Sequence, residues 1–252
     1  MEMKLKADVR SSRMSNENYL LNKKVKIYQP EGFYRASSDA VWLSAAVNKV
    51  KKGDNILDVG SGTGAVSLCL AERFKNSEIS ITGIELQSVL AESATQSAIT
   101  NGFKFVNFIN SNIFQNDLKP CSFAHVITNP PYAENDMPSP NESKAIAHNF
   151  QYADLSGWLN FCIKMLRPQG YFYIINRTEA LEDIIRHISG KLGKIEIFPL
   201  YSKISQNAKR IIIRAQKDSK TPLVVHPGII VHNEDGSYSD KAEKILRLGE
   251  AI

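Results

Sequence analysis

The sequence predicts an α/β fold built on a mostly parallel sheet, and two observations support this class. Short apolar runs rich in β-branched residues alternate with longer segments of helical periodicity. Clusters of glycine, proline and asparagine separate the two kinds of segment. Strands that alternate with helices are typical of parallel sheets with right-handed crossovers.

Length and composition indicate one large globular domain. The chain has 252 residues, of which 43% are hydrophobic and 23% are charged, enough to bury a substantial core. No apolar run approaches the roughly 18 residues of a membrane span, and the basic N-terminus lacks the apolar stretch of a secretory signal. Cys69, Cys121 and Cys162 lack the spacing of metal ligands. These features predict a cytoplasmic protein with reduced thiols and no metal.

Basic residues gather in two segments of the chain. The net charge is +5, and residues 1–26 hold seven Lys or Arg against three acids, while residues 203–220 hold six against one. A nucleic-acid partner and ordinary solvated lysines are both compatible with this distribution. We expect a basic N-terminal arm over 1–26 and a single domain over 27–252, with a C-terminal extension from about 218.

The domain is expected to open with a short edge strand and a helix. Residues 25–30 alternate in polarity and end at a proline, as edge strands do. The run 40–50 has helical periodicity, and Ser37 or Ser38 is a suitable N-cap. Asp39 suits the first turn of this helix, and a role at a ligand is an equally open interpretation.

Three strands and two helices are expected next. A glycine-rich turn joins the first of these strands to a helix, and the second helix ends at an Asn-Gly pair. The strands are predicted at 55–59, 79–84 and 105–109, and the helices at 65–74 and 87–100.

The alternation continues through the second half of the chain. The β-branched run 123–128 is closed by two prolines and predicts a buried strand. Residues 133–153 lack a period and predict a functional or flexible loop, in which Lys144 and His148 either contact substrate or face solvent. Helices are further predicted at 155–166, 178–188 and 240–248, strands at 171–175, 195–200 and 209–215, and an extended piece at 223–225.

The tetrapeptide Asn129-Pro130-Pro131-Tyr132 directly follows the predicted strand 123–128. Neither proline has a backbone N–H, and each disfavours helix in the residue before it. An amide side chain, a carbonyl group and an aromatic ring are therefore expected at the carboxyl edge of the sheet, where ligands of open α/β sheets bind. This set suits a planar group bearing –NH2, although a loop merely stiffened by prolines has the same sequence.

A second candidate site surrounds the glycine-rich turn. The segment from Gly60 to Ala65 also satisfies the loose dinucleotide fingerprint. Asp58, two residues earlier, would oppose a pyrophosphate but favours a cationic group or the N–H groups of the turn. Glu85 lies 21 residues after Gly64, at a strand end where a carboxylate can accept both ribose hydroxyls.

Together these motifs resemble those of Rossmann-like S-adenosylmethionine-dependent methyltransferases. Residues 58–64 are similar to motif I of that family, Glu85 to its second-strand acid, and the tetrapeptide at Asn129 to the NPPY motif of its amino-methylating branch. The stretch 29–39 resembles bacterial tRNA1(Val) adenine-N6 methyltransferases, which modify the anticodon loop, and this similarity runs through most of 19–249. The resemblance implies a mostly parallel seven-stranded sheet with helices on both faces and an antiparallel last strand.

The same resemblance implies S-adenosylmethionine as cofactor, tRNA as substrate and N6 of adenine as the methyl acceptor. Asn112 stands where the family usually carries an aspartate that contacts the cofactor adenine, and its amide can still accept and donate. The implied catalytic residues are Asn129, Pro130, Pro131 and Tyr132. The implied cofactor-binding residues are Arg35, Asp58, Gly60, Ser61, Gly62, Gly64, Glu85, Leu86, Asn112 and Asn129.

Other functions compete with this hypothesis. A protein-glutamine N5 methyltransferase would present the same –NH2 group, but such enzymes usually carry a helical N-terminal domain. A DNA adenine methyltransferase would need a target-recognition segment that the sequence does not show. A cofactor-binding scaffold without catalysis is disfavoured by the intact motif at Asn129, and a nicotinamide-dependent oxidoreductase by Asp58. A monomer and a homodimer are both compatible with the sequence.

Overall fold

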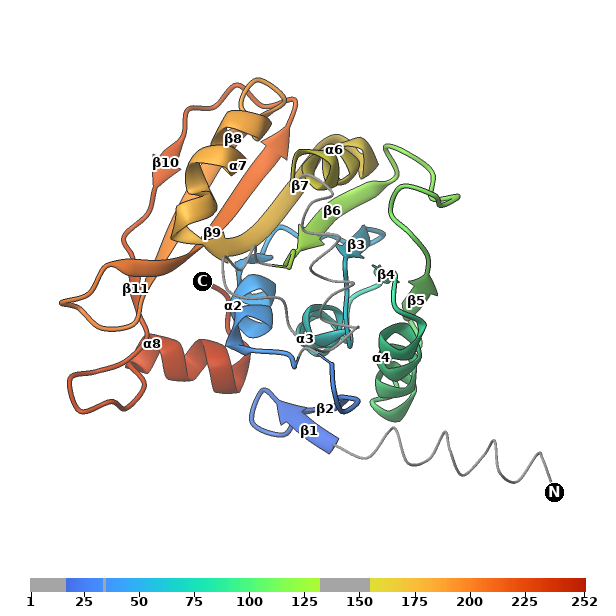
Figure 1. Ribbon diagram of the computed structural model, residues 1–252, viewed down its shortest axis with the longest axis horizontal. Coiled ribbons are helices and arrows are strands. Elements are labelled where there is room, and N and C mark those ends of the chain that lie inside the picture. The colour runs from blue at the N-terminus through green and yellow to red at the C-terminus, as the bar shows by residue number, and fades with distance from the viewer. Residues whose placement is uncertain (1–16, 34, 132–154) are drawn as a thin grey trace.

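The structure, a computed structural model, describes residues 17–33, 35–131 and 155–252. Within these residues one large sheet runs through the molecule, with helices on both of its faces (Figure 1). The strands of this sheet are β3 (Asn55–Val59), β4 (Ser80–Glu85), β5 (Val106–Asn110), β6 (Phe123–Thr128), β7 (Leu166–Arg177), β8 (Leu192–Tyr201), β9 (Ala208–Lys217), β10 (Val224–Val225) and β11 (Ile229–Ile230).

The strand order is β10-β8-β9-β7-β6-β3-β4-β5, with β11 also paired to β8. Strands β5, β4, β3, β6 and β7 are parallel neighbours. Strand β9 lies antiparallel between β7 and β8. The predicted fold class is therefore confirmed, with the two-residue strands β10 and β11 added at the β8 edge.

Two hydrophobic clusters cover the two faces of the sheet. Side chains alternate along a strand, so Ile56 packs into one cluster and its neighbour Leu57 into the other. Side chains of helices α2, α3, α8 and η2 pack into the first cluster, and side chains of α6 and α7 pack into the second. The helices are α2 (Ser38–Ala46), α3 (Ala65–Arg73), α4 (Ser88–Thr100), α6 (Leu155–Met165), η1 (Thr178–Ala180), α7 (Leu181–Ile188), α8 (Asp240–Glu243) and η2 (Lys244–Leu248).

Helix α2 ends at Ala46, earlier than the predicted 50. Its N-cap is Ser37, whose hydroxyl accepts the N–H of Asp39 at 3.2 Å. At the other end, Arg214 of β9 donates to the carbonyl oxygen of Ala46 at 3.2 Å and to the side chain of Asn48 at 2.8 Å. These contacts of Arg214 hold the backbone at the point where the helix ends, although the helical periodicity of the sequence continues to residue 50.

Strand β7 begins at Leu166 and is longer than the predicted 171–175. Leu166 pairs with Phe123, and the register then shifts before His125 pairs with Tyr171. The predicted closing helix is divided into α8 and the π-helical turn η2, which ends at Leu248 and is capped by Gly249.

A hairpin of β1 (Glu17–Leu20) and β2 (Val25–Tyr28) packs beside the sheet domain (Figure 1). Val25 and Ile27 are fully buried, and the backbone N–H of Tyr28 donates to the hydroxyl of Ser97 in α4 at 3.0 Å. Residues 17–26 of the expected arm thus belong to, or adjoin, this hairpin. Residues 1–16 lie outside the described part of the chain, and the domain boundaries stay a prediction.

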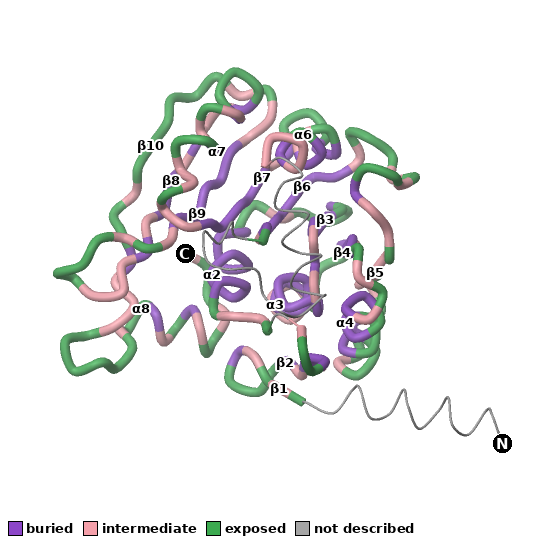
Figure 2. The backbone as a smooth tube through the Cα atoms, viewed as in Figure 1, coloured by how far each residue is buried: buried purple, intermediate pink, exposed green. Residues whose placement is uncertain are grey.

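Burial follows the layers of the fold. Figure 2 shows β6, α2 and α3 as mostly buried, whereas the segment that carries β10 is exposed. None of the helices within the described ranges is long and apolar enough to cross a membrane.

A buried polar network joins β3, β6 and β7 near the amino edge of the sheet. The His125 ring lies 3.1 Å from Asp54 and 3.3 Å from the Tyr173 hydroxyl, and Arg167 donates to Asp54 at 2.8 Å. Burial lowers the pKa of His125, against the effect of the nearby carboxylate. This network therefore connects strands at the edge opposite to the glycine-rich turn.

Candidate active site

The predicted site residues from three strands meet at the carboxyl edge of the sheet. Val59 of β3 pairs with Ile84 of β4 and with Thr128 of β6. The residue after each of these is Gly60, Glu85 or Asn129, so the three motifs begin at the same level of neighbouring strands.

The glycine-rich turn is held by backbone hydrogen bonds and by two aromatic rings. The N–H groups of Gly60 and Ser61 both donate to the carbonyl oxygen of Ile84, at 2.9 and 3.1 Å. A Cβ on Gly60 would lie 2.7 Å from the Trp158 ring. At Gly64, which begins α3, a Cβ would lie 2.6 Å from the Phe108 ring. Both positions have positive φ as well, so glycine is required there for two reasons.

Asp58 and Glu85 each accept hydrogen bonds from the protein at this edge. Asp58 is 1% exposed and accepts from the N–H of Ser67 at 3.2 Å and from its hydroxyl at 2.7 Å. Glu85 accepts the N–H groups of Gly62 and Gln87, each at 2.9 Å. Asp58 therefore braces the first turn of α3, and Glu85 is the acid that binds the glycine-rich turn.

Both carboxyl groups have a raised pKa. Burial raises the pKa of Asp58 to about 6, although the hydrogen bonds from Ser67 oppose the rise. Burial also raises the pKa of Glu85, against the backbone N–H groups that it accepts. Because burial disfavours their charged forms, a ligand with a cationic centre or hydroxyl donors would favour ionisation of both acids.

The candidate adenine-binding residues lie on and after the next strand ends. Leu86 is 37% exposed, a high value for a leucine that directly follows a buried strand. Asn110 donates to the carbonyl oxygens of Glu85 at 3.0 Å and of Leu86 at 2.8 Å. The side-chain oxygen of Asn112 accepts the N–H of Phe114 at 2.9 Å and keeps a second lone pair. Sequence reasoning missed Asn110, whose only signal was a polar residue at the end of a strand.

The residues that follow β6, Asn129, Pro130 and Pro131, form the corner of the site where we expect the methyl acceptor, called the acceptor corner below. Asn129 is half-buried, Pro130 is buried and Pro131 is exposed. Tyr132, Lys144 and His148 lie outside the described residues, so their expected roles stay predictions. Sequence reasoning also missed Trp158, which no motif includes and whose place in a helical pattern gave no functional signal.

Two candidates near the N-terminus bind other parts of the protein. Arg35 is exposed and donates to the side chain of Asn18 at 2.9 Å. Asp39 is buried and accepts from Arg210 of β9 at 3.1 Å, so it connects α2 to the sheet. The cofactor role predicted for Arg35 stays a prediction.

The groups at the carboxyl edge fit an S-adenosyl ligand. A Cβ on Gly62 would meet no atom within 4 Å, so the backbone there faces open space. The Ser61 hydroxyl is buried and has no hydrogen-bond partner among the described residues. The oxygens of Glu85 retain lone pairs for hydroxyl donors beside the N–H groups that they already accept.

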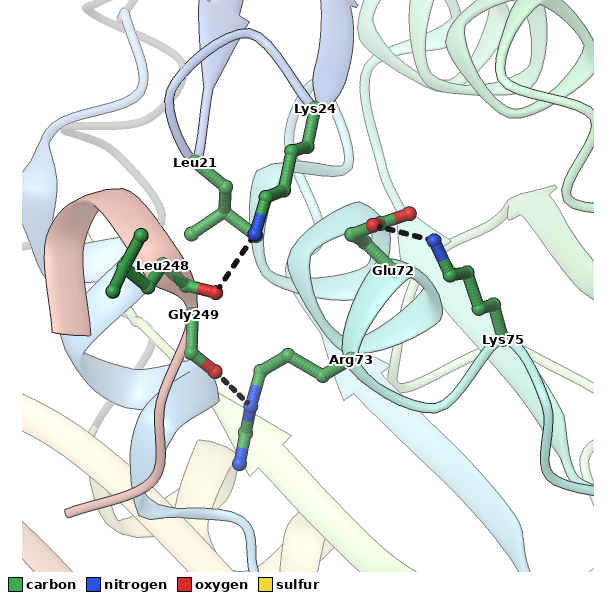
Figure 3. A pocket seen from close by; sticks show the side chains of 7 residues that line it. All are labelled: Leu21, Lys24, Glu72, Arg73, Lys75, Leu248 and Gly249. Atoms are coloured by element: carbon green, nitrogen blue, oxygen red, sulfur yellow. Dashed lines mark hydrogen bonds and ion pairs between the residues drawn. The ribbon is translucent and has the colours of Figure 1, made fainter. Parts of the chain in front are cut away.

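A cavity of about 410 Å³ lies away from this edge. Its cations bind protein oxygens, as Figure 3 shows: Lys24 donates to Leu248 at 3.2 Å and Arg73 to Gly249 at 2.9 Å. Arg73 is the last residue of α3, and Gly64 of the glycine-rich turn is its N-cap. The length of this helix, about 13 Å, therefore separates the cavity from the glycine-rich turn. The cavity therefore marks the junction of the hairpin, α3 and the C-terminus. Its lining residues are Leu21, Lys24, Glu72, Arg73, Lys75, Leu248 and Gly249.

Comparison with known proteins finds relatives over most of the chain. Proteins named tRNA1(Val) (adenine(37)-N6)-methyltransferase are 25% identical over 222 residues in Dyadobacter fermentans and 26% identical over 226 residues in Pedobacter heparinus. These matches cover 86% and 89% of this chain, and 90% and 94% of the relatives. A release factor glutamine methyltransferase from Fusobacterium nucleatum is 40% identical over 82 residues, which are 32% of this chain and 23% of that protein.

Among solved structures, a "predicted O-methyltransferase" from Agrobacterium tumefaciens has a TM-score of 0.70 at 21% identity and covers 85% of this chain and 97% of its own. That likeness shows the fold. The sequence profile of a methyltransferase domain matches residues 50–221, a range that includes the glycine-rich turn, Glu85 and Asn129. The chain therefore belongs to the methyltransferase domain family, which implies S-adenosylmethionine as its methyl donor.

Proposed function

We propose that this methyltransferase transfers a methyl group to the N6 amine of an adenine in tRNA, in the anticodon-loop region. The observation that carries the proposal is the strand register, which sets Asn129, the residue before Pro130, level with Gly60 and Glu85. An acceptor held by the first pair and a cofactor held by the second would meet at one corner. The two relatives with the tRNA1(Val) name support the choice of tRNA adenine.

In this proposal Asn129 and Pro130 hold the acceptor amine. An exocyclic amine on adenine is a weak nucleophile because its lone pair is delocalised into the ring. When the Asn129 side-chain oxygen and the Pro130 carbonyl accept its two N–H bonds, the nitrogen becomes pyramidal, so its lone pair is localised and directed toward the methyl group, and the developing positive charge is stabilised. Bound S-adenosylmethionine supplies an electrophilic methyl group on a sulfonium. The methylated amine then loses one proton to solvent, so no strong base is required.

The basic segment 203–220 contributes only in part to a surface for RNA. Arg214 forms two bonds with Glu196, at 2.7 and 2.8 Å, and Lys217 donates to the carbonyl of Leu166 at 2.8 Å. Both side chains thus stabilise the fold. Lys209, in contrast, is exposed near the start of β9, at the carboxyl edge. Because β9 lies two strands from β6, this lysine is roughly 10 Å across the sheet from the strand that carries Asn129, and roughly another 10 Å further along the strand direction, a suitable place for a phosphate contact.

A second candidate function is methylation of a protein glutamine at N5. The side-chain amide of glutamine offers the same –NH2 group to Asn129 and Pro130. The similarity to the Fusobacterium release factor methyltransferase, 40% over 82 residues, favours this candidate over a DNA substrate.

Transfer of labelled methyl groups to bulk tRNA, total protein and DNA tests the proposal. We expect the label in tRNA, recovered as N6-methyladenosine after digestion to nucleosides, and none with Asn129→Ala. Label confined to protein would support the glutamine candidate instead. A wild-type chain that labels none of the three would refute the proposed function.

A further inference from the structure

We infer that Trp158 is a positioning residue that holds the acceptor corner in a fixed position relative to the glycine-rich turn. Its indole contacts both sides of the site. The Nε1–H donates to the hydroxyl of Thr128 at 2.8 Å, and the six-membered ring of the indole lies so close to Gly60 that a Cβ there would be 2.7 Å from it. Thr128 immediately precedes Asn129, and Gly60 opens the glycine-rich turn.

The hydrogen bonds form a chain with a defined direction. Indole nitrogen can only donate, so the Thr128 oxygen must accept from Trp158 and send its own hydrogen elsewhere. That hydrogen goes to the carbonyl oxygen of Val59 at 2.9 Å. Val59 directly precedes Gly60. The last residue of β6 and the last residue of β3 are therefore joined through one hydroxyl whose orientation the indole sets.

Because the Thr128 hydroxyl is buried, solvent cannot replace the hydrogen bonds that it makes. Thr128 is fully buried, so its hydroxyl cannot find a water molecule in exchange for a lost partner. Trp158 belongs to α6, which packs on the opposite face of the sheet from α3. The indole therefore connects helix α6 to the carboxyl ends of both β3 and β6.

The expected effect is on alignment rather than on binding. If the hydrogen bonds from Trp158 to Thr128 and from Thr128 to Val59 are lost, Asn129 and the glycine-rich turn keep their own contacts but change their relative position. A small misplacement of reacting groups can lower a rate by about 100-fold. This inference rests on the proposed placement of Asn129 at the acceptor amine, and its test must separate the two.

The test compares Thr128→Val with Thr128→Ser. Valine has the shape of threonine without its hydroxyl, whereas serine keeps the hydroxyl and loses only a methyl group. Trp158→Phe removes the N–H from the other side. The matched control is Ser44→Ala, which removes another fully buried hydroxyl, bonded to the Val41 carbonyl at 2.8 Å in α2.

We expect kcat for methyl transfer to fall about 10- to 100-fold in Thr128→Val and Trp158→Phe, while Thr128→Ser and Ser44→Ala stay within about threefold of wild type. The Kd for S-adenosylhomocysteine should stay within about threefold in every variant. Thermal unfolding checks that all of them fold. A Thr128→Val chain with wild-type kcat overturns the inference, and so does one that loses cofactor affinity as much as turnover.

Fluorescence gives a readout that needs no acceptor. The chain has two tryptophans, so Trp42→Phe leaves Trp158 as the only indole. Because the Trp158 ring contacts Gly60, S-adenosylhomocysteine should change its emission, and an unchanged spectrum at saturating ligand overturns the inference. If wild type methylates none of the acceptors, the proposed function fails, and the emission change alone then decides about Trp158.

Discussion

The Glu85 carboxylate accepts the backbone N–H of Gly62 at 2.9 Å, so the acid that ends β4 and the turn that follows β3 form one unit. Its second oxygen accepts the N–H of Gln87, the N-cap residue of α4. One buried side chain therefore orders the glycine-rich turn, the strand end and the start of a helix. A ligand that bonds to Glu85 would meet groups already held in position.

We expect Glu85→Gln to weaken binding of S-adenosylhomocysteine by about 10- to 100-fold, the equivalent of roughly 1.5–3 kcal/mol for hydrogen bonds to a charged group. Glutamine keeps one acceptor oxygen but loses the charge and the second acceptor. Isothermal titration measures the change. Glu78→Gln is the matched control, because Glu78 is exposed just before the same strand and pairs with Lys52. Equal affinities in the two variants would exclude Glu85 from the cofactor site.

Cofactor affinity should depend on pH through Asp58. Burial raises the pKa of this carboxyl from its ordinary 3.8 to about 6, so between these values the folded chain holds a proton that the unfolded chain has released. The group therefore stabilises the fold at low pH, and this contribution is lost as the pH rises through about 6. Ionised Asp58 favours a cationic group such as the ammonium of the amino-acid part of S-adenosylhomocysteine, so affinity for this ligand should rise from pH 5 to about 7 and then level off.

Titration calorimetry across this range measures the affinity, and the same experiment in buffers of different ionisation enthalpy measures proton release. Asp58→Asn is the control, since a side chain that cannot ionise should remove the dependence near pH 6. A wild-type affinity that stays flat from pH 5 to 7 would show that Asp58 does not titrate on binding.

Asn129→Ala should lower turnover by at least about 100-fold, because it removes a hydrogen-bond acceptor that acts on the charge developing in the transition state. Cofactor affinity should stay within a few-fold of wild type. Asn107→Ala, at an exposed position of β5, is the control for loss of an asparagine side chain. Single-turnover rates together with calorimetry separate the two effects, and an active Asn129→Ala chain contradicts the assigned role.

The two ends of the basic segment should differ in their contribution to RNA binding. Lys209 lies at the carboxyl edge of the sheet, and Lys220 follows the end of β9 at the opposite edge, with both lysines exposed. Lys209→Ala should weaken tRNA binding and reduce the slope of log K against log salt by about one. Lys220→Ala changes the net charge equally and should leave both unchanged. Filter binding at several salt concentrations measures the slopes, and identical slopes would argue against a phosphate contact at Lys209.

Much of this protein is determined by its sequence alone. The alternation of apolar runs with helical periods predicted the α/β class and most of the elements, because these patterns reflect which face of each element is buried. The turn at Gly60 and the prolines after Thr128 were also readable, since glycine and proline restrict the backbone locally. The carboxyl ends of parallel strands lie at one edge of the sheet. For that reason the positions of Gly60, Glu85 and Asn129 at the ends of their strands predicted that the three residues lie together at this edge.

Only the tertiary structure decided which side chains complete the site. Trp158 contacts Gly60, Asp58 binds Ser67 rather than the glycine-rich turn, and Arg214 is committed to Glu196 instead of an RNA surface. Each of these pairs joins segments that local periodicity treats as independent. Their partners depend on how helices dock on the sheet and on which charges are desolvated there, and these are properties of the packed chain, not of any one stretch of it.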